Sequence, residues 1–451
     1  MASQEGPQAS DATETVTRKE LRTVLLSCMV GTTVEWYDFF LYGVAAGTVF
    51  NKLFFPSDDP VVGTLLAFAT FAIGFVARPV GGLIFGHIGD RVGRKRTLVM
   101  TMLIMGVATF LIGVIPTYDS IGTLAPVLLI AMRLLQGVAV GGEWGGAVLM
   151  AVEYAPSNRR GVFGSLPQMG LALGLILGTG VFAVLESLLA DDAFLSWGWR
   201  IAFMLSAILV IIGLVVRLKV METPAYRKLE EREGKAAVPA VELFRGRLNR
   251  RHIWLGMGAR WIEGVIFNTF AVFAITYGVD EVGVSRGTML WTVMAAAAVL
   301  LAMIPVFGQV SDRYGRRQVY AVGTAVCALA TIPAFMLIDS GSTVLIVVAI
   351  VGVLGILYAI MYGPEAALFA ELFVPNVRYT GISFVYQFSG IFASGLTPLI
   401  LTYLLDLGNG PGLMIAYFLI VGAISTVTTL MIRQSDLVRI EEAEAVPALA
   451  E

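Results

Sequence analysis

The sequence has few of the residues that bind metals or form disulfides. It contains two cysteines and two histidines in 451 residues, and Cys28 and Cys327 lie far apart within apolar runs. His87 and His252 lack the spacing of metal ligands, so we expect buried thiols, no disulfide and no metal site. The sequence also lacks a G-x-x-x-x-G-K-[ST] loop, an H-E-x-x-H helix and a G-x-S-x-G turn, which argues against ATP-driven transport, an enzyme or any bound cofactor.

Charge is scarce as well. Only 14% of the residues are charged and the net charge is -2, against about 25% charged residues in a typical soluble protein. Without an excess of basic residues the chain is not expected to bind nucleic acid. The chain is instead 57% hydrophobic with 49 glycines and has a mean hydropathy of +0.80. This composition indicates a membrane protein with closely packed helices.

Long apolar runs account for most of the length. A membrane-crossing helix needs about 20 apolar residues, and twelve runs reach or approach that length. They cover about residues 23–50, 61–85, 97–118, 122–152, 161–189, 198–219, 252–278, 287–310, 318–339, 343–371, 380–405 and 411–433. The first run is too long for the core of a cleaved signal peptide, so we interpret it as a retained helix. The sequence therefore predicts an all-α membrane protein.

The basic residues are unevenly distributed between the two sides of these spans. Of the 31 lysines and arginines, 25 lie on the side that holds both termini and the central loop. The opposite side has Lys52, Arg200 and Arg286, and three arginines lie inside spans: Arg78, Arg133 and Arg260. Because basic residues are retained inside the cell, this asymmetry predicts that both termini and the central loop are cytoplasmic.

The sequence repeats itself after about half its length. The segment G-H-I-G-D-R-V-G-R-K begins at Gly86 and G-Q-V-S-D-R-Y-G-R-R begins at Gly308, which places Asp90 and Asp312 222 residues apart. Glu143 and Glu365 have the same separation. This duplication predicts two six-helix halves related by an axis along the membrane normal. We expect an N-terminal tail (1–20), a first half (21–219), a central cytoplasmic loop (220–251), a second half (252–433) and a C-terminal tail (434–451).

The repeated motif resembles the hallmark of the major facilitator superfamily. The run R-L-L-Q-G-V-A-V-G-G from Arg133 is similar to a second motif of that superfamily. The segments E-W-Y-D-F (35–39), A-R-P-V-G-G (77–82), G-G-E-W-G-G (141–146) and W-G-W-R (197–200) resemble the bacterial metabolite:proton symporter family, whose members carry shikimate, 2-oxoglutarate, citrate, proline and betaine. The resemblance implies twelve transmembrane helices in two pseudo-symmetric bundles, and transport by alternating access in the bacterial inner membrane.

The resemblance also implies a cytoplasmic gate made of charged motif residues. Such networks would lock the cytoplasmic side when the carrier faces outward; static anchoring at lipid headgroups is the alternative. Glu143 and Glu365 are expected nearer the cytoplasm, with partners such as Arg78. The gate set comprises Arg78, Gly86, Asp90, Arg91, Gly93, Arg94, Glu143, Glu153 and Arg160 in the first half, and Asp312, Arg313, Gly315, Arg316, Glu365, Glu371 and Arg378 in the second.

Charges within the spans are candidates for coupling and binding, since a charge near the bilayer centre costs at least about 2.5 kcal/mol. Glu35 and Asp38 lie three residues apart on one face of the first span. Two close carboxylates in a poorly hydrated cavity favour protonation of one of them, so we predict Asp38, and second Glu35, as the proton-coupling residue. Permanent pairing with an arginine of another span is the alternative. An exchangeable proton on Asp38 or Glu35 would make protons the coupling ion.

Arg133 lies near the middle of the fourth span. It can hold a substrate carboxylate through a bidentate contact, or form a permanent salt bridge to the first span. Arg260 and Glu263 can pair with each other or bind substrate. Polar side chains in membrane bundles also bridge helices, and bridging is the alternative for the other predicted binding residues. The predicted binding residues are Arg133, Gln136, Tyr37, Tyr42, Gln168, Arg260, Glu263, Asn268, Tyr358, Tyr362, Tyr386 and Gln387.

These observations predict a proton-coupled importer of a small organic acid, such as a shikimate-like, aromatic or aliphatic carboxylate. Uptake of a zwitterionic osmolyte similar to proline or betaine is an alternative, although the short C-terminal tail does not favour an osmosensor. A non-transporting membrane sensor with the same fold is a further alternative. We expect the partners to be the substrate, protons and the lipid bilayer, and a single chain to be functional.

Overall fold

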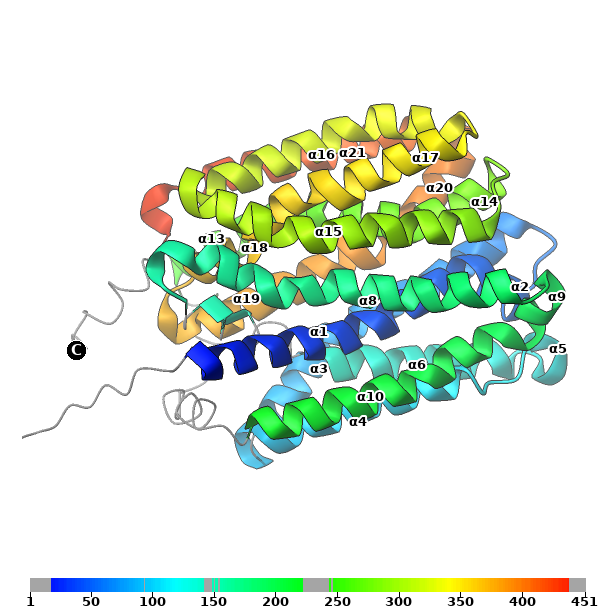
Figure 1. Cartoon of the computed structure of the whole chain (residues 1–451), viewed down its shortest axis with the longest axis horizontal. Helices are drawn as coiled ribbons and strands as arrows, with labels where there is room; N and C mark the ends of the chain where they lie inside the picture. Colours follow the sequence, from blue (N-terminus) through cyan, green and yellow to red (C-terminus); the bar gives the residue numbers. More distant parts are fainter. Residues whose placement is uncertain are drawn as a thin grey trace, which may run out of the picture.

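The protein is a bundle of long helices that run side by side, as the computed structural model shows (Figure 1). The structure describes residues 18–92, 94–141, 148–149, 151–152, 155–221, 243–244 and 246–437. Within these ranges nine helices are long and apolar enough to cross a membrane, and helices over Val99–Ile112 and Leu124–Val140 are shorter and apolar. With the first helix these make twelve helical rods, which confirms the predicted all-α membrane fold.

The first six rods form one bundle, in the lower part of Figure 1. Their main helices are α1 (Arg18–Ala45), α3 (Pro60–Val92), α4 (Arg94–Ile112), α6 (Leu124–Val140), α8 (Arg160–Leu188) and α10 (Trp199–Met221). Within the bundle α3 packs on α6, α4 packs on α6 and α10, and α1 packs on α8 and α10. The close packing of α3 and α6 depends on glycine, because a Cβ added at Gly81 would lie 1.9 Å from the carbonyl oxygen of Val138.

The last six rods form a second bundle, in the upper part of Figure 1. Their helices are α13 (Arg247–Asn268), α14 (Ala274–Asp280), α15 (Arg286–Tyr314), α16 (Arg316–Asp339), α17 (Thr343–Ile350), α18 (Tyr358–Leu372), α19 (Pro375–Gly390), α20 (Thr397–Gly408) and α21 (Gly412–Met431). The two bundles meet along α8 and α15. A substrate path between the halves would have to separate these two helices at one end.

Several rods contain a π-helical turn, which the continuous apolar sequence does not reveal. The turn at Ala46–Phe50 follows α1, and the turn at Thr269–Phe273 joins α13 to α14. These turns begin 223 residues apart, almost the offset of the repeated motif. Further π turns lie at Val351–Leu357 and Ile391–Gly395. π turns often mark functional sites in helices.

The repeated charged motif is largely helical, although the apolar runs predicted as helices end at residues 85 and 310. Helix α3 continues to Val92 and helix α15 to Tyr314, because backbone hydrogen bonds four residues apart can continue past the apolar zone. The turn in the second copy is confined to Gly315, whose φ of 92° suits glycine.

Both ends of the bundle interface are closed. We call the end that carries Arg160, Arg313 and Arg316 the basic face, and the end that carries Arg200 and Arg286 the opposite face. At the basic face the α8–α15 contact is so close that a Cβ added at Gly161 would lie 2.4 Å from the carbonyl oxygen of Gly308. At the opposite face Arg286 Nη1 pairs with Glu186 Oε2 at 3.0 Å. The structure is therefore an occluded one.

Candidate functional site at the centre of the bundle

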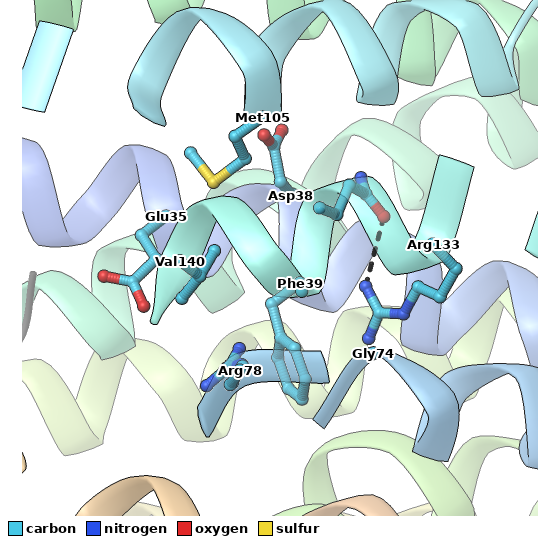
Figure 2. A pocket seen from close by; sticks show the side chains of 10 residues that line it. Glu35, Asp38, Phe39, Gly74, Arg78, Met105, Arg133 and Val140 are labelled. Atoms are coloured by element: carbon cyan, nitrogen blue, oxygen red, sulfur yellow. Dashed lines mark hydrogen bonds between the residues drawn. The ribbon is translucent and has the colours of Figure 1, made fainter. Parts of the chain in front are cut away.

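A small cavity lies within the first bundle, between α1, α3, α4 and α6. Five polar side chains line it: Glu35, Asp38, Arg78, Arg133 and Gln136 (Figure 2). Its volume of about 10 Å³ holds roughly one water molecule. A metabolite requires more space, so binding must widen this region.

Asp38 contributes a buried carboxylate to this cavity. Its side chain comes from α1 and points toward Met105 of α4 (Figure 2), and the residue is 3% exposed. Within the described part of the chain neither carboxylate oxygen meets the geometry of a hydrogen bond. The Thr109 hydroxyl and the Arg133 guanidinium are its polar neighbours. A charged carboxylate without a partner is costly in such surroundings.

Arg133 is also buried and incompletely paired. Its Nη1 donates to Gln136 Oε1 at 3.3 Å and its Nη2 to the Phe71 carbonyl at 3.4 Å, both long hydrogen bonds. Among the described residues it has no carboxylate at salt-bridge distance, and its Nε has no partner. The guanidinium instead faces the ring of Tyr42, 4.2 Å from its centre.

The neighbouring residues hold Arg133 in this position. Gly74 of α3 leaves the necessary room, because a Cβ there would lie 2.4 Å from Arg133 Nε. Gln136 is oriented by its own donation to the Thr109 hydroxyl at 2.7 Å. Tyr42 is fixed by a 2.7 Å hydrogen bond to the Thr70 hydroxyl. Nothing in a helical sequence shows which small residues face a distant arginine, so Gly74, Thr70 and Thr109 are not among the predicted site residues.

Glu35 and Arg78 form the part of the cavity that faces the second bundle. Glu35 lies one turn before Asp38 on α1 and interacts electrostatically with Arg78. The Arg78 guanidinium lies 4.5 Å from the centre of the Phe75 ring. Arg78 was expected among the gate residues, and the structure places it at the central cavity.

A second buried charge cluster lies in the other half. Arg260 of α13 contacts Glu263 at 3.3 Å and Glu365 of α18 at 3.2 Å. It also donates to the Ser389 hydroxyl at 3.0 Å and lies 3.7 Å from the centre of the Tyr386 ring. Glu365 was expected near the cytoplasm beside Arg78. The structure places it with Arg260 instead, because α18 brings residue 365 to the depth of Arg260.

The two clusters meet at the boundary between the bundles. Tyr386 lies between Arg260 and Glu35, and Arg78 and Arg260 are close enough to repel each other. Gln168 Nε2 donates to the Tyr362 carbonyl, and Gln387 Nε2 donates to the Gly141 carbonyl at 3.3 Å. Both glutamines thus link one bundle to the other.

Aromatic rings of the two bundles also pack against one another near these polar links. The ring of Trp36 lies 6.2 Å from that of Phe267, and Phe267 lies 5.2 Å from Tyr358. Tyr358 stacks on Tyr362 at 5.1 Å, and its hydroxyl donates to Glu263. Aromatic faces from both halves therefore adjoin the charged residues.

Two predicted binding residues lie elsewhere in the packing. The Tyr37 hydroxyl donates to the Ala202 carbonyl at 2.8 Å, which ties α1 to α10. The Asn268 amide donates to the Gly264 carbonyl of its own helix at 2.9 Å. Tyr37 therefore links two helices, which is the alternative to substrate binding given above for polar residues in the bundle.

At the basic face Asp312 joins the two halves. Its Oδ1 accepts from the Gly161 amide at 2.8 Å and its Oδ2 from the Val162 amide at 3.1 Å, at the start of α8. A carboxylate there satisfies free amides and the positive end of the helix dipole. Arg316 links Asp312, at 3.2 Å, to Glu371.

Three further predicted gate residues, Arg378, Arg160 and Arg313, belong to the described part of the chain. Arg378 Nε donates to the Phe373 carbonyl at 3.1 Å, Arg160 is buried and Arg313 is exposed. Gly93, Glu143 and Glu153 lie outside the described residues, as do the side chains at Gly86, Asp90, Arg91 and Arg94.

The opposite face has a closing pair that the motifs do not indicate. Arg286 begins α15 and Glu186 lies near the end of α8, so their 3.0 Å ion pair joins the two bundles. The guanidinium also lies 5.3 Å from the centre of the Phe194 ring. The sequence feature that could have indicated this ion pair is the scarcity of basic residues on this side, where Arg286 is one of three.

Two helical bundles closed at both ends around buried charges form the architecture of a membrane transporter. Comparison with known proteins gives the family. Residues 23–240 match the family described as Sugar (and other) transporter, and residues 260–448 match the Major Facilitator Superfamily.

Individual relatives agree with this assignment. The shikimate transporter of Escherichia coli K12 is 38% identical, over 93% of this chain and 96% of its own length. The proline/betaine transporter of the same strain is 33% identical, over 92% and 84%. A D-xylose-proton symporter structure superimposes with a TM-score of 0.69 at 16% identity, over 92% and 97%. The chain belongs to the major facilitator superfamily, among its bacterial metabolite transporters, and is a multi-pass membrane transporter rather than an enzyme.

Proposed function

We propose that this transporter imports a small organic acid together with protons, by alternating access between its two faces. The observation that carries the proposal is a pair of neighbouring buried groups that lack direct partners among the described residues: Arg133 has no carboxylate at salt-bridge distance, and neither oxygen of Asp38 meets the geometry of a hydrogen bond. A permanent salt bridge between them would have left neither group available.

The two groups give a simple coupling scheme. With a proton on Asp38 the carboxyl group is neutral, and Arg133 is the only charge of the pair. Arg133 can then bind a substrate carboxylate through two parallel hydrogen bonds. When Asp38 loses its proton to the cytoplasm, its negative charge competes for Arg133 and the substrate is released.

The substrate class follows from the surroundings of Arg133 and from the relatives. A carboxylate suits the guanidinium, and the rings of Phe39, Phe71 and Tyr42 around it suit an apolar or cyclic body. A hydroxylated ring acid such as shikimate, named in one relative, fits this description. The second candidate is a zwitterion such as proline or betaine, because aromatic faces also attract a cationic nitrogen.

The orientation in the membrane is part of the proposal. The basic face would be cytoplasmic, with both termini on that side of the bacterial inner membrane, because retained basic residues mark the inside. A single chain contains both bundles and would transport without a partner subunit, cofactor or metal. Labelling of a cysteine introduced at the exposed Arg313, only when an impermeant thiol reagent is trapped inside vesicles, would support this orientation.

Uptake into proteoliposomes tests the function. Labelled shikimate, proline and betaine are supplied outside, with the outside acidic. We expect accumulation of one of them that collapses when the pH gradient is dissipated. Arg133→Lys should raise its KM about tenfold or more, since losing a bidentate contact worth about 1.4 kcal/mol is a factor of ten, whereas Arg200→Lys at the opposite face should not.

The outcomes separate the alternatives. Proton-dependent uptake of proline or betaine alone would favour the osmolyte candidate. If a broad panel of organic acids and zwitterions shows no proton-dependent uptake, the importer is refuted and the non-transporting sensor remains. An unchanged KM and coupling in Arg133→Lys would refute the role given to Arg133.

A further inference from the structure

The charge cluster of the second half contains more acid than base. Arg260 Nη2 lies 3.3 Å from Glu263 Oε2, and Arg260 Nε lies 3.2 Å from Glu365 Oε1. The side chains of Arg260 and Glu263 are 3% exposed and that of Glu365 is fully buried. Glu365 Oε2 has no hydrogen-bond partner within the described part of the chain. One guanidinium therefore serves two carboxylates.

The groups that face this cluster do not supply the missing positive charge. Its neighbours from α16, α18 and α19 are phenols: Tyr320, Tyr358, Tyr362 and Tyr386. Across the boundary Arg78 of α3 is the nearby cation, and it faces Glu35 of α1. Arg78 is thus matched by Glu35 and does not offset the second carboxylate of the cluster.

An extra negative charge at this depth is expensive. Burying an unpaired carboxylate costs several kcal/mol, and a single arginine cannot offset two of them. Protonation removes that cost, because a neutral carboxyl group can remain beside the Arg260–carboxylate pair. We propose that Glu263 and Glu365 share one proton in the closed transporter and so form a second proton-binding site, distinct from Asp38.

A second proton-binding site would change the number of protons carried with each substrate. The proton comes from water when a face opens and is returned to water when the cluster is hydrated again, with no other bond changed. If the proposed symport is correct, each half contributes one proton site, and the ratio of protons to substrate is two. The site itself depends only on the charge balance of the cluster, so it can be tested without transport.

Infrared spectroscopy of the purified protein in lipid nanodiscs tests the site directly. A protonated carboxyl group gives a carbonyl-stretch band that is separate from carboxylate bands and shifts in D₂O. The starting protein carries Asp38→Asn, which removes the other expected acid, and no substrate is added. At neutral pH we expect one acid band. Adding either Glu263→Gln or Glu365→Gln should abolish it, because the remaining glutamate then balances Arg260. Adding Arg260→Gln should about double it.

The matched control is Asp436→Asn, because Asp436 pairs with Arg251 at 2.6 Å within the second half, closes neither face, and its loss should leave the band unchanged. Absence of an acid band in the Asp38→Asn protein would overturn the proposal, and this measurement alters nothing in the cluster. A band that survives either glutamate substitution would also overturn it. Failed uptake with a preserved band would refute only the proposed transport.

Discussion

The crossing of α8 and α15 at the basic face allows the closed arrangement to be tested quantitatively. A methyl group added at Gly161 would lie 2.4 Å from the Gly308 carbonyl oxygen and 2.8 Å from Asp312 Oδ1. The first of these atoms belongs to the backbone of α15 and cannot turn away. The second is held by the amides of Gly161 and Val162. Gly161→Ala must therefore push the two helices apart at this face.

The size of the effect follows from the cost of overpacking, which is about 1–3 kcal/mol for one added methyl group. That cost arises only in conformations whose basic face is closed. The equilibrium should therefore shift toward conformations open at the basic face by a factor of about 5 to 150. Substrate need not be present, since the substitution acts on the helix contact alone.

Gly180→Ala is the matched control on the same pair of helices. A methyl group there would meet a single atom within 4 Å, Met294 Sδ at 3.2 Å. A methionine side chain can move aside. Gly180 lies in the interior of α8, whereas Gly161 lies in its first turn, so the gain in helix propensity, about 1 kcal/mol for Gly to Ala in a helix interior, is not larger for Gly161→Ala, and an opening seen only in Gly161→Ala reports the clash.

Pulsed EPR distances provide the assay. The two native cysteines, both buried thiols outside any disulfide, are first replaced, and spin labels are attached at the exposed positions Arg159 and Tyr314. Gly161→Ala should add a population at longer distance that Gly180→Ala lacks. Identical distance distributions in the two variants would refute the reasoning that these helices must part for the basic face to open.

Three further outcomes are expected. Asp38→Asn should abolish accumulation driven by a pH gradient but preserve exchange of substrate, as counterflow would show; accumulation that persists contradicts the coupling role. Arg286→Gln should break the pair with Glu186 and make the opposite face accessible to thiol reagents at introduced cysteines, and unchanged labelling would argue against a closing role. Arg200→Gln removes hydrogen bonds to the Gly113 and Ile115 carbonyls and should cost about 2 kcal/mol, measurable as a lower Tm in detergent, whereas an unaltered Tm would show that water replaces them.

Most of the architecture is visible in the sequence because the membrane imposes it. A span must satisfy its backbone internally, so each long apolar run had to be a helix, and the offset between Asp90 and Asp312 revealed two halves. The ends of the helices were less predictable. Hydrogen bonding continues past the apolar zone, and α3 therefore runs on to Val92.

The candidate site was only partly predictable. Arg260 and Glu263 lie three residues apart, so their pairing was foreseeable from helix geometry. The third member, Glu365, is 102 residues beyond Glu263, and only the packing of α18 against α13 brings it there. That Arg133 has no carboxylate at salt-bridge distance among the described residues was also invisible, because the sequence offered both Glu35 and Asp38 of the first span as partners.

The π turn after α1 makes residues before it and residues after it face different directions. A π turn adds one residue to the local repeat, which rotates the following segment by about 100° relative to an uninterrupted α-helix. Asp38 precedes the turn and Gly47, which packs against Thr276 of the other half, lies within it. The residue proposed for proton coupling thus lies before the π turn, and the contact that seals the helix against the other half lies within it. Such a helix can acquire a new specificity by substitution before the turn while its seal is left untouched.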